Sequence, residues 1–249
     1  MTAAPDPTPN GATCPNPSHH EARQHDHDAV LVGDVPIAVW RLDDHDDTDP
    51  SAAPGSRLAS RLAQRLVLVY TRRGDTIVDF DSDPTLEHAS VRTSRSYLSI
   101  TDPTTVADLD ALLGPVSLVV LRWPPRHTRT PTAITDLFTA CRLIMTTDAC
   151  AIAAVSSAAP GQPGTTYAEH LDELLPAARA VGLNHVRHIV VVRGTDTGDE
   201  FLYYASEAEA SREKSRADEG GNHPMELLVF TAGQWHNEGH TMVLAVTPP

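Results

Sequence analysis

Two hydrophobic periods alternate between residues 56 and 193, and together they predict a series of helices and strands. A helical spacing of apolar positions predicts a helix over about 56–71. Gly74 then interrupts the pattern, and the β-branched, half-apolar run Thr76–Phe80 predicts a buried strand. The apolar positions of the helix are Leu58, Leu62, Leu66 and Tyr70.

The same alternation continues along the chain. Val116–Leu121 is the most continuous apolar strand, and Pro124 and Pro125 stop its hydrogen-bonded ladder. The other predicted helices are 85–93, 105–113, one that begins near Thr130 and carries Ile134 to Met145, and one that carries Tyr167 to Val181 and ends at Gly182; the other predicted strands are 97–101, 150–156 and 188–192. Strands that alternate with helices, joined by right-handed crossovers, predict an α/β fold with a doubly wound, mostly parallel sheet.

Composition divides the chain into three parts. Residues 1–28 are rich in Pro, Asn, Asp and His and predict a disordered tail. Residues 29–55 predict one or two strands, broken at Gly33 and Asp34, and an acidic linker. Residues 56–249 form the main domain, with a charged loop or helix over 194–222 and final strands at 225–231 and 241–246.

The charge balance restricts the partners of the protein. The formal net charge of −14 and the pI near 5.2 oppose binding to nucleic acid and to anionic lipid. Arg122, Arg126, His127 and Arg129 nevertheless crowd into eight residues, so a DNA contact would have to be made there. No apolar run approaches the roughly 20 residues that span a bilayer, and the N-terminus does not resemble a signal peptide. We therefore expect a cytoplasmic protein whose partners are a second protein or a local stretch of DNA, and not a membrane.

Common catalytic motifs are absent from the sequence. It contains no GxxxxGK[ST], GxGxxG, GxSxG or HExxH. Cys14 lies in the polar tail, whereas Cys141 and Cys150 lie in apolar segments, which predicts buried thiols rather than disulfides. The histidines of the tail lack the spacing of a closed metal site, and His236, Glu238 and His240 fit a hairpin loop, so no metal site is predicted.

An ordered set of segments carries a family resemblance. GDTIVDFDSD at 74–83 follows a helix, SRSYLSIT occupies 94–101, VSLVVLRWPPR occupies 116–126, and HIVVVR and NHPMELLVFTAG follow at 188–193 and 222–233. This order resembles the amino-group DNA methyltransferases, which modify N4 of cytosine or N6 of adenine. The resemblance implies a class I methyltransferase (Rossmann-like) sheet and S-adenosylmethionine as cofactor. The short interval from Thr101 to Ser117 implies that one edge strand is missing.

The resemblance also implies the residues of a site. The cofactor would lie at the end of the first strand, with Thr101 or Asp102 at the ribose, and the substrate would lie at the prolines that follow the 116–121 strand. The implied cofactor residues are Asp79, Phe80, Asp81, Ser82, Asp83, Thr101 and Asp102; the implied catalytic residues are Trp123, Pro124, Pro125 and Arg126.

The sequence departs from the family at both places. Asp81, Ser82 and Asp83 stand where glycines let the cofactor approach the backbone. Trp123 stands where the family has a hydrogen-bond acceptor for the target amine, and an indole has only an N–H donor. The departures predict weakened or lost catalysis. The alternative is a non-catalytic binding or regulatory scaffold with the same fold.

Each site residue also has a structural interpretation. The acids of 79–83 can cap the next helix, Trp123 can close the core at the end of its strand, and the arginines can form a solvated rim with the excess acids. The sequence leaves these alternatives open.

Overall fold

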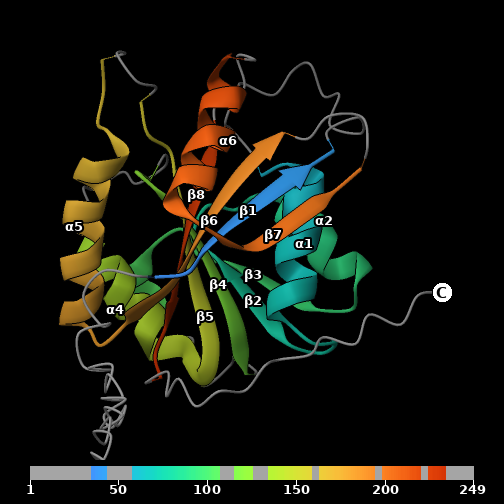
Figure 1. Cartoon of the computed structure of the whole chain (residues 1–249). Helices are drawn as coiled ribbons and strands as arrows, with labels where there is room; N and C mark the ends of the chain where they lie inside the picture. Colours follow the sequence, from blue (N-terminus) through green and yellow to red (C-terminus); the bar gives the residue numbers. More distant parts are fainter. Residues whose placement is uncertain are drawn as a thin grey trace, which may run out of the picture. The chain divides into compact units, whose positions relative to one another are not determined.

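The computed structural model describes residues 35–43, 58–106, 115–125, 134–158, 163–193, 198–219 and 224–233. The chain divides into residues 1–34 and a compact unit that runs from Val35 to Pro249, and all described residues belong to the second unit (Figure 1). The predicted tail at 1–28, the chain from 29 to 34 and the predicted strand at 241–246 lie outside the described residues.

One mixed sheet forms the centre of this unit. Its eight strands in the described residues follow the order β3-β2-β4-β5-β8-β6-β1-β7. The elements are β1 (Ile37–Leu42), α1 (Ser60–Tyr70), β2 (Thr76–Asp79), α2 (Pro84–Arg92), β3 (Ser96–Ser99), the 3₁₀ helix η1 (Pro103–Thr105), β4 (Val116–Trp123), α4 (Ile134–Ile144), β5 (Met145–Val155), α5 (Tyr167–Ala180), β6 (Asn184–Arg193), β7 (Glu200–Ala205), α6 (Glu207–Glu219) and β8 (Met225–Thr231). Strands β3, β2, β4 and β5 are parallel neighbours, and β1 is parallel to β6.

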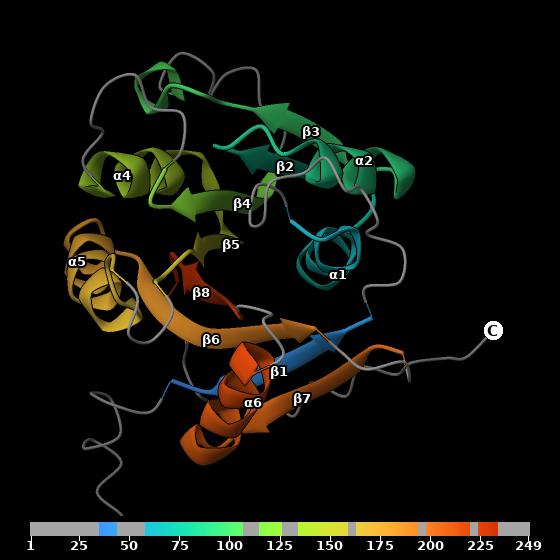
Figure 2. The same cartoon turned by 90° about the horizontal axis from the view of Figure 1, so that it is seen from above.

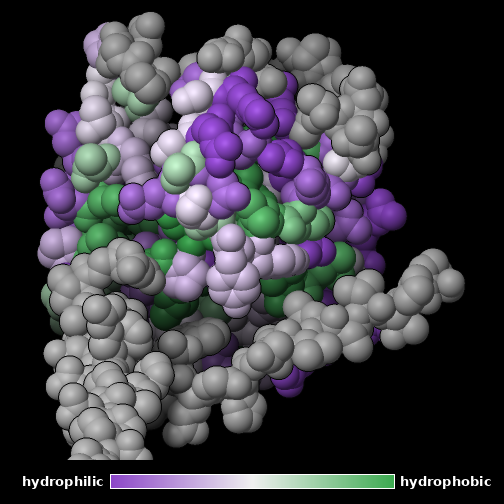
Figure 3. Space-filling model, in the orientation of Figure 1, coloured by the Kyte–Doolittle hydropathy of each residue, from purple (hydrophilic) through white to green (hydrophobic). Residues whose placement is uncertain are grey.

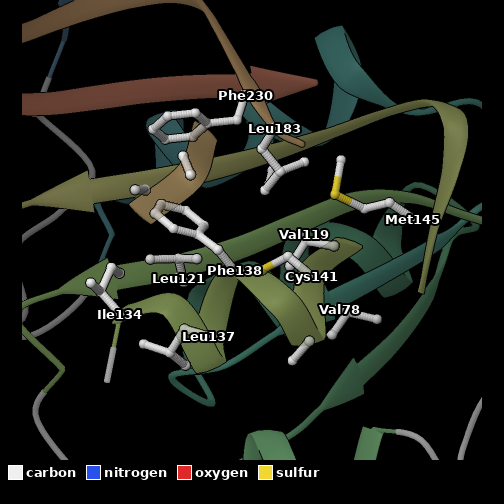
Figure 4. Close-up of a cluster of buried hydrophobic side chains, with 14 of the residues drawn as sticks. Val78, Val119, Leu121, Ile134, Leu137, Phe138, Cys141, Met145, Leu183 and Phe230 are labelled. Atoms are coloured by element: carbon white, nitrogen blue, oxygen red, sulfur yellow. The ribbon is translucent and has the colours of Figure 1, made fainter. Parts of the chain in front are cut away.

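Helices cover both faces of the sheet, as Figure 2 shows from above. Helices α4 and α5 pack on one face, and α1 and α2 pack on the other. The alternation of side chains along β4 explains how one strand serves both cores. Leu118 and Val120 pack toward α1, whereas Val119 and Leu121 pack toward α4, where they contact the cluster around Phe138 and Phe230 (Figure 4).

The predicted doubly wound, mostly parallel α/β sheet is confirmed. β3 borders the sheet, and among the described residues no strand pairs with its outer side; the loss of an edge strand stays a prediction, because residues 107–114 lie outside the described residues. Strand β8 runs antiparallel between β5 and β6. The sheet also includes β1, which lies before the start predicted for the main domain at residue 56.

Local sequence signals set several element boundaries. Gly74 and Gly182 adopt positive φ of 86° and 79°, which glycine reaches without a side-chain clash, and they follow α1 and α5 as predicted. A capping box between Thr166 and Glu169 begins α5. The helix predicted over 105–113 lies mostly outside the described residues, and η1 precedes it.

One strand was not predicted. The segment 194–222 contains β7 before α6, and β7 pairs antiparallel with β1. Its exposure alternates residue by residue, which is typical of a strand with one face against the core.

Two further expectations concern cysteine and membranes. Cys141 is buried and Cys150 is half-buried, both as free thiols, and burial raises the pKa of Cys150 to about 11. In the described ranges, every helix is too short or too polar to cross a bilayer.

Candidate functional site

The candidate site lies where β2, β3 and β4 end side by side. In the sheet register, Asp79 at the end of β2 is opposite Ser99 of β3 and Val120 of β4. The backbone N–H of Phe80 donates to the carbonyl of Val120 at 3.0 Å and so continues the pairing by one residue. The strands of the segments 74–83 and 116–126 are thus parallel neighbours with their carboxyl ends at one edge, where open α/β sheets bind ligands.

Asp79 is fully buried and builds the turn that follows β2. Its Oδ1 accepts the backbone N–H of Asp81 at 2.8 Å, and its Oδ2 accepts the N–H of Asp83 at 2.7 Å and the hydroxyl of Tyr97 at 2.8 Å. Burial raises the pKa of Asp79, and the hydrogen bonds from the two N–H groups oppose that rise. The resemblance implies a cofactor contact for Asp79, but both of its oxygens are used within the turn.

Asp83 caps α2, as the structural interpretation of the acids predicted. Its Oδ1 accepts the N–H of Thr85 at 2.9 Å. Its Oδ2 accepts the N–H of Leu58 at 2.7 Å and lies 3.4 Å from Nη2 of Arg122. Asp83 therefore connects the start of α2, the chain before α1 and the end of β4.

Arg122 lies at the carboxyl end of β4, and its side chain is beside the turn that follows β2. Its side chain is only 4% exposed, and its Nε lies 4.0 Å from Oδ2 of Asp81. Burial raises the pKa of Asp81 to about 6, although the positive charge of Arg122 acts in the opposite direction. We call Arg122, Asp81 and Asp83 the cleft ion network. The expectation that Arg122 belongs to a solvated basic rim is wrong, because this guanidinium is buried between two carboxylates.

Trp123 points to the opposite face of the sheet from Arg122. It is 7% exposed and belongs to the core cluster of Leu137 and Phe138, which Figure 4 shows between β4 and α4. Its Nε1 has no hydrogen-bond partner among the described residues. The structure therefore places Trp123 in the core, as the alternative interpretation of this residue predicted.

Two of the predicted catalytic residues, Pro124 and Pro125, directly follow β4. Pro124 is exposed, Pro125 is half-buried, and Arg126 lies outside the described residues, as do His127 and Arg129. Ser82 is exposed with φ of 57°, a left-handed conformation that glycine adopts more readily.

Thr101 and Asp102 follow β3 and are both exposed. Asp102 accepts hydrogen bonds from the N–H and hydroxyl of Thr104 at 2.9 and 2.7 Å, and these bonds lower its pKa. Asp102 thus caps η1 rather than pointing into the cleft.

Two small cavities lie on either side of the cleft ion network. One encloses about 270 Å³, open solvent included, and is lined by Phe80, Asp81, Thr101, Pro103, Leu121, Arg122, Pro125 and Leu137. The other encloses about 180 Å³ and is lined by Leu58, Asp79, Asp81, Asp83, Val120, Leu121, Arg122 and Ala154. Without the open solvent, each leaves room for about one water molecule, far less than a typical small-molecule site. Asp81, Leu121 and Arg122 line both cavities.

A second polar cluster lies away from the cleft and was not predicted. His188 of β6 contacts Glu226 of β8 through Nε2, and Lys214 of α6 contacts the other oxygen of that carboxylate. The hydroxyl of Tyr167 lies 3.0 Å from the same Nε2. Burial raises the pKa of Glu226, but the hydrogen bond and charge of His188, together with Lys214, lower it overall. The four residues come from four elements, so no local sequence pattern could reveal them.

This second cluster fixes helices rather than catalysing a reaction. A proton relay through His188 would need its acid and its hydroxyl partner on different ring nitrogens, and here both are at Nε2. The cluster instead connects α5 and α6 to the sheet. Helix α6 buries little apolar surface, and Figure 3 shows hydrophilic side chains gathered over it, so ion pairs such as Lys214–Glu226 and Arg41–Glu213 contribute to its position.

Comparison with known proteins gives remote structural similarities. No protein-family model and no curated protein matches the chain. A TehB-like S-adenosylmethionine-dependent methyltransferase from Corynebacterium glutamicum is 13% identical, with 68% of this chain and 86% of that chain covered and a TM-score of 0.37. Geranyl diphosphate C-methyltransferase from Streptomyces coelicolor is 14% identical, with 77% and 90% covered and a TM-score of 0.40. The antibiotic-resistance methyltransferase Kmr is 16% identical, with 82% and 90% covered and a TM-score of 0.36. At these scores the assignment of the α/β fold rests on the sheet order itself.

Proposed function

We propose that this chain is a diverged S-adenosylmethionine-dependent methyltransferase-like protein that no longer methylates amino groups and acts as a binding or regulatory scaffold. The observation that carries the proposal is the cleft ion network. Arg122, Asp81 and Asp83 crowd the carboxyl ends of the paired strands β2 and β4, where a ligand of this fold would lie.

The turn after β2 supports low affinity for S-adenosylmethionine. Asp81 and Ser82 place side chains where the resembled family has glycines, and the Asp81 carboxylate would face a ligand that carries its own carboxylate. The Cβ atoms narrow the approach to the backbone, and the like charges repel. Any cofactor that enters must also displace Asp81 from Arg122.

The end of β4 supports the loss of catalysis. In the resembled family this position supplies an acceptor to the target amine, but the indole of Trp123 packs in the core and has only a donor. The exposed Pro124 that follows has no polar side chain. The cleft therefore lacks, at this position, the group that would make an amine more nucleophilic.

The proposal also concerns the choice of ligand to test and a contact with DNA. S-adenosylmethionine is the ligand to test first, because the sequence resemblance implies it and because the geranyl diphosphate C-methyltransferase was solved with S-adenosylhomocysteine. A DNA contact through Arg126 and Arg129 stays a prediction, and the buried Arg122 would add little to it.

Calorimetric titration of the full chain with S-adenosylmethionine tests the proposal. We expect a Kd on the order of millimolar or weaker, which corresponds to about 4 kcal/mol or less. An assay with S-adenosylmethionine labelled on its methyl group, with duplex and single-stranded DNA as substrates, should show no transfer above a protein-free control. Micromolar binding together with methyl transfer would contradict the proposal and restore an active enzyme.

A further inference from the structure

Exposed hydrophobic side chains concentrate on α1 and β7. Six large hydrophobic side chains are exposed among the described residues, and three of them belong to these two elements and lie where the elements meet. Leu68 and Val69 of α1 are 48% and 39% exposed, and Tyr204 of β7 is 76% exposed. Several exposed apolar side chains in one area are typical of a surface that binds another molecule.

Two arginines connect these side chains into one surface. Arg65 lies one helical turn before Val69 on the same side of α1, and its guanidinium donates to the hydroxyl of Tyr203 in β7. The guanidinium of Arg187 in β6 lies 5.8 Å from the ring centroid of Tyr204. The second half of α1 therefore packs beside β7. We define the α1–β7 surface as Arg65, Leu68, Val69, Arg187 and Tyr204.

The α1–β7 surface is positively charged, although the protein as a whole is acidic. Among the described residues, neither Arg65 nor Arg187 forms an ion pair with a carboxylate. Arg72 and Arg73 directly follow α1, are exposed, and form no ion pair within the described ranges. The chain has 33 acidic and 19 basic side chains, so four arginines without a carboxylate partner at one place make a local region of opposite charge.

We propose that the α1–β7 surface is a docking site for an acidic segment of a partner protein. Leu68, Val69 and Tyr204 pack against apolar side chains of that segment, and the arginines bind its carboxylates. Tyr and Arg are the residue types that most often contribute strongly to protein interfaces. The surface includes no residue of the cleft ion network, so this inference is independent of the proposed function.

Other classes of partner fit this surface less well. Nucleic acid would bind the arginines but would leave the aliphatic side chains of Leu68 and Val69 without apolar contacts. DNA and an anionic membrane also extend along the protein and meet its net charge of −14, whereas a short segment meets only the charges within about 10 Å. A second copy related by a twofold axis through this surface would bring like charges together.

The first test measures binding of a synthetic acidic peptide to the full chain at pH 7. The peptide consists of Glu and Leu, with Leu at the spacing of one helix face and a fluorescent label. We expect a Kd on the order of 10–100 μM, and weaker binding as the salt concentration rises. A peptide of the same composition with scattered Leu, and one with Lys in place of Glu, should each bind at least about tenfold more weakly.

Two variants test whether the peptide binds at the α1–β7 surface. Leu68→Asp and Tyr204→Asp change exposed side chains, and each should weaken binding at least about tenfold, because each places a carboxylate against the acidic peptide. Leu143→Asp, at a 59% exposed position of α4 on the other face of the sheet, is the matched control and should bind like the wild type. Thermal melts of the three variants check the fold.

NMR of the wild-type chain with the unlabelled peptide gives a second measurement that needs no variant. We expect chemical-shift changes at the amides of 65–73 and 201–205. Such changes, together with weaker binding by both variants, support the inference.

Several results would overturn the inference. These are no binding of the peptide, binding that Leu68→Asp and Tyr204→Asp leave unchanged, or shift changes confined to other elements. Tighter binding of single-stranded DNA or of phosphatidylserine vesicles than of the peptide would assign the surface to a different class of partner. Dimerisation in sedimentation experiments that Tyr204→Asp abolishes would assign it to a second copy of the chain.

Discussion

Replacing Arg122 with Met is expected to lower the free energy of unfolding by about 3–5 kcal/mol, because it leaves buried carboxylates without their cation. Asp83 is 5% exposed and its Oδ2 lies 3.4 Å from Nη2 of Arg122, so water cannot readily replace the guanidinium. Urea denaturation at pH 7 measures the change.

The controls for this variant use residues of similar chemistry. Arg92→Met removes an exposed guanidinium from α2 and should change stability by less than about 0.5 kcal/mol. Arg122→Lys keeps the charge, so its loss of unfolding free energy should lie between those of Arg92→Met and Arg122→Met. A change for Arg122→Met as small as that for Arg92→Met would show that the cleft ion network does not stabilise the fold.

Asp79→Asn is expected to lower the free energy of unfolding by about 2–4 kcal/mol, because the change places an N–H₂ donor where the turn needs an acceptor. The N–H groups of Asp81 and Asp83 donate to different oxygens of Asp79, so whichever way the amide is turned, one N–H loses its acceptor. Thermal or urea unfolding of the variant provides the measurement.

Tyr97→Phe is the matched variant for this turn. It removes only the hydroxyl that donates to Oδ2 of Asp79 at 2.8 Å, and it should cost about 1 kcal/mol. If the two variants were equally stable, the two backbone hydrogen bonds to Asp79 would not be what holds the turn.

The sequence predicted those parts of the fold in which one local pattern determines the element. The apolar run of β4 and the stripe of α1 are long enough to be read directly, and Gly74 marks the turn between α1 and β2. Strand β7 lies between two charged stretches and alternates exposed and half-buried residues, so its pairing with β1, about 160 residues away, left no strong local pattern.

The roles of the site residues depend on the direction in which each side chain points, and the sequence does not specify that direction. Arg122 and Trp123 are adjacent, and the alternation along β4 sends one into the cleft and the other into the core. The sequence identified both residues but could not assign their faces, because the ends of the strand were uncertain. The contacts of Asp79 with the turn, and those of Glu226 with His188 and Lys214, require the three-dimensional structure.

The claim that the guanidinium of Arg122 is buried in the cleft ion network can be tested most directly by NMR. The measurement is hydrogen exchange at its Nε–H in the ligand-free chain near pH 7. We expect slow exchange of this proton, because the side chain is 4% exposed and lies between Asp81 and Asp83, and fast exchange of the corresponding proton of the exposed Arg92. Exchange at Arg122 as fast as at Arg92 would mean that the guanidinium points into solvent and that the cleft is open.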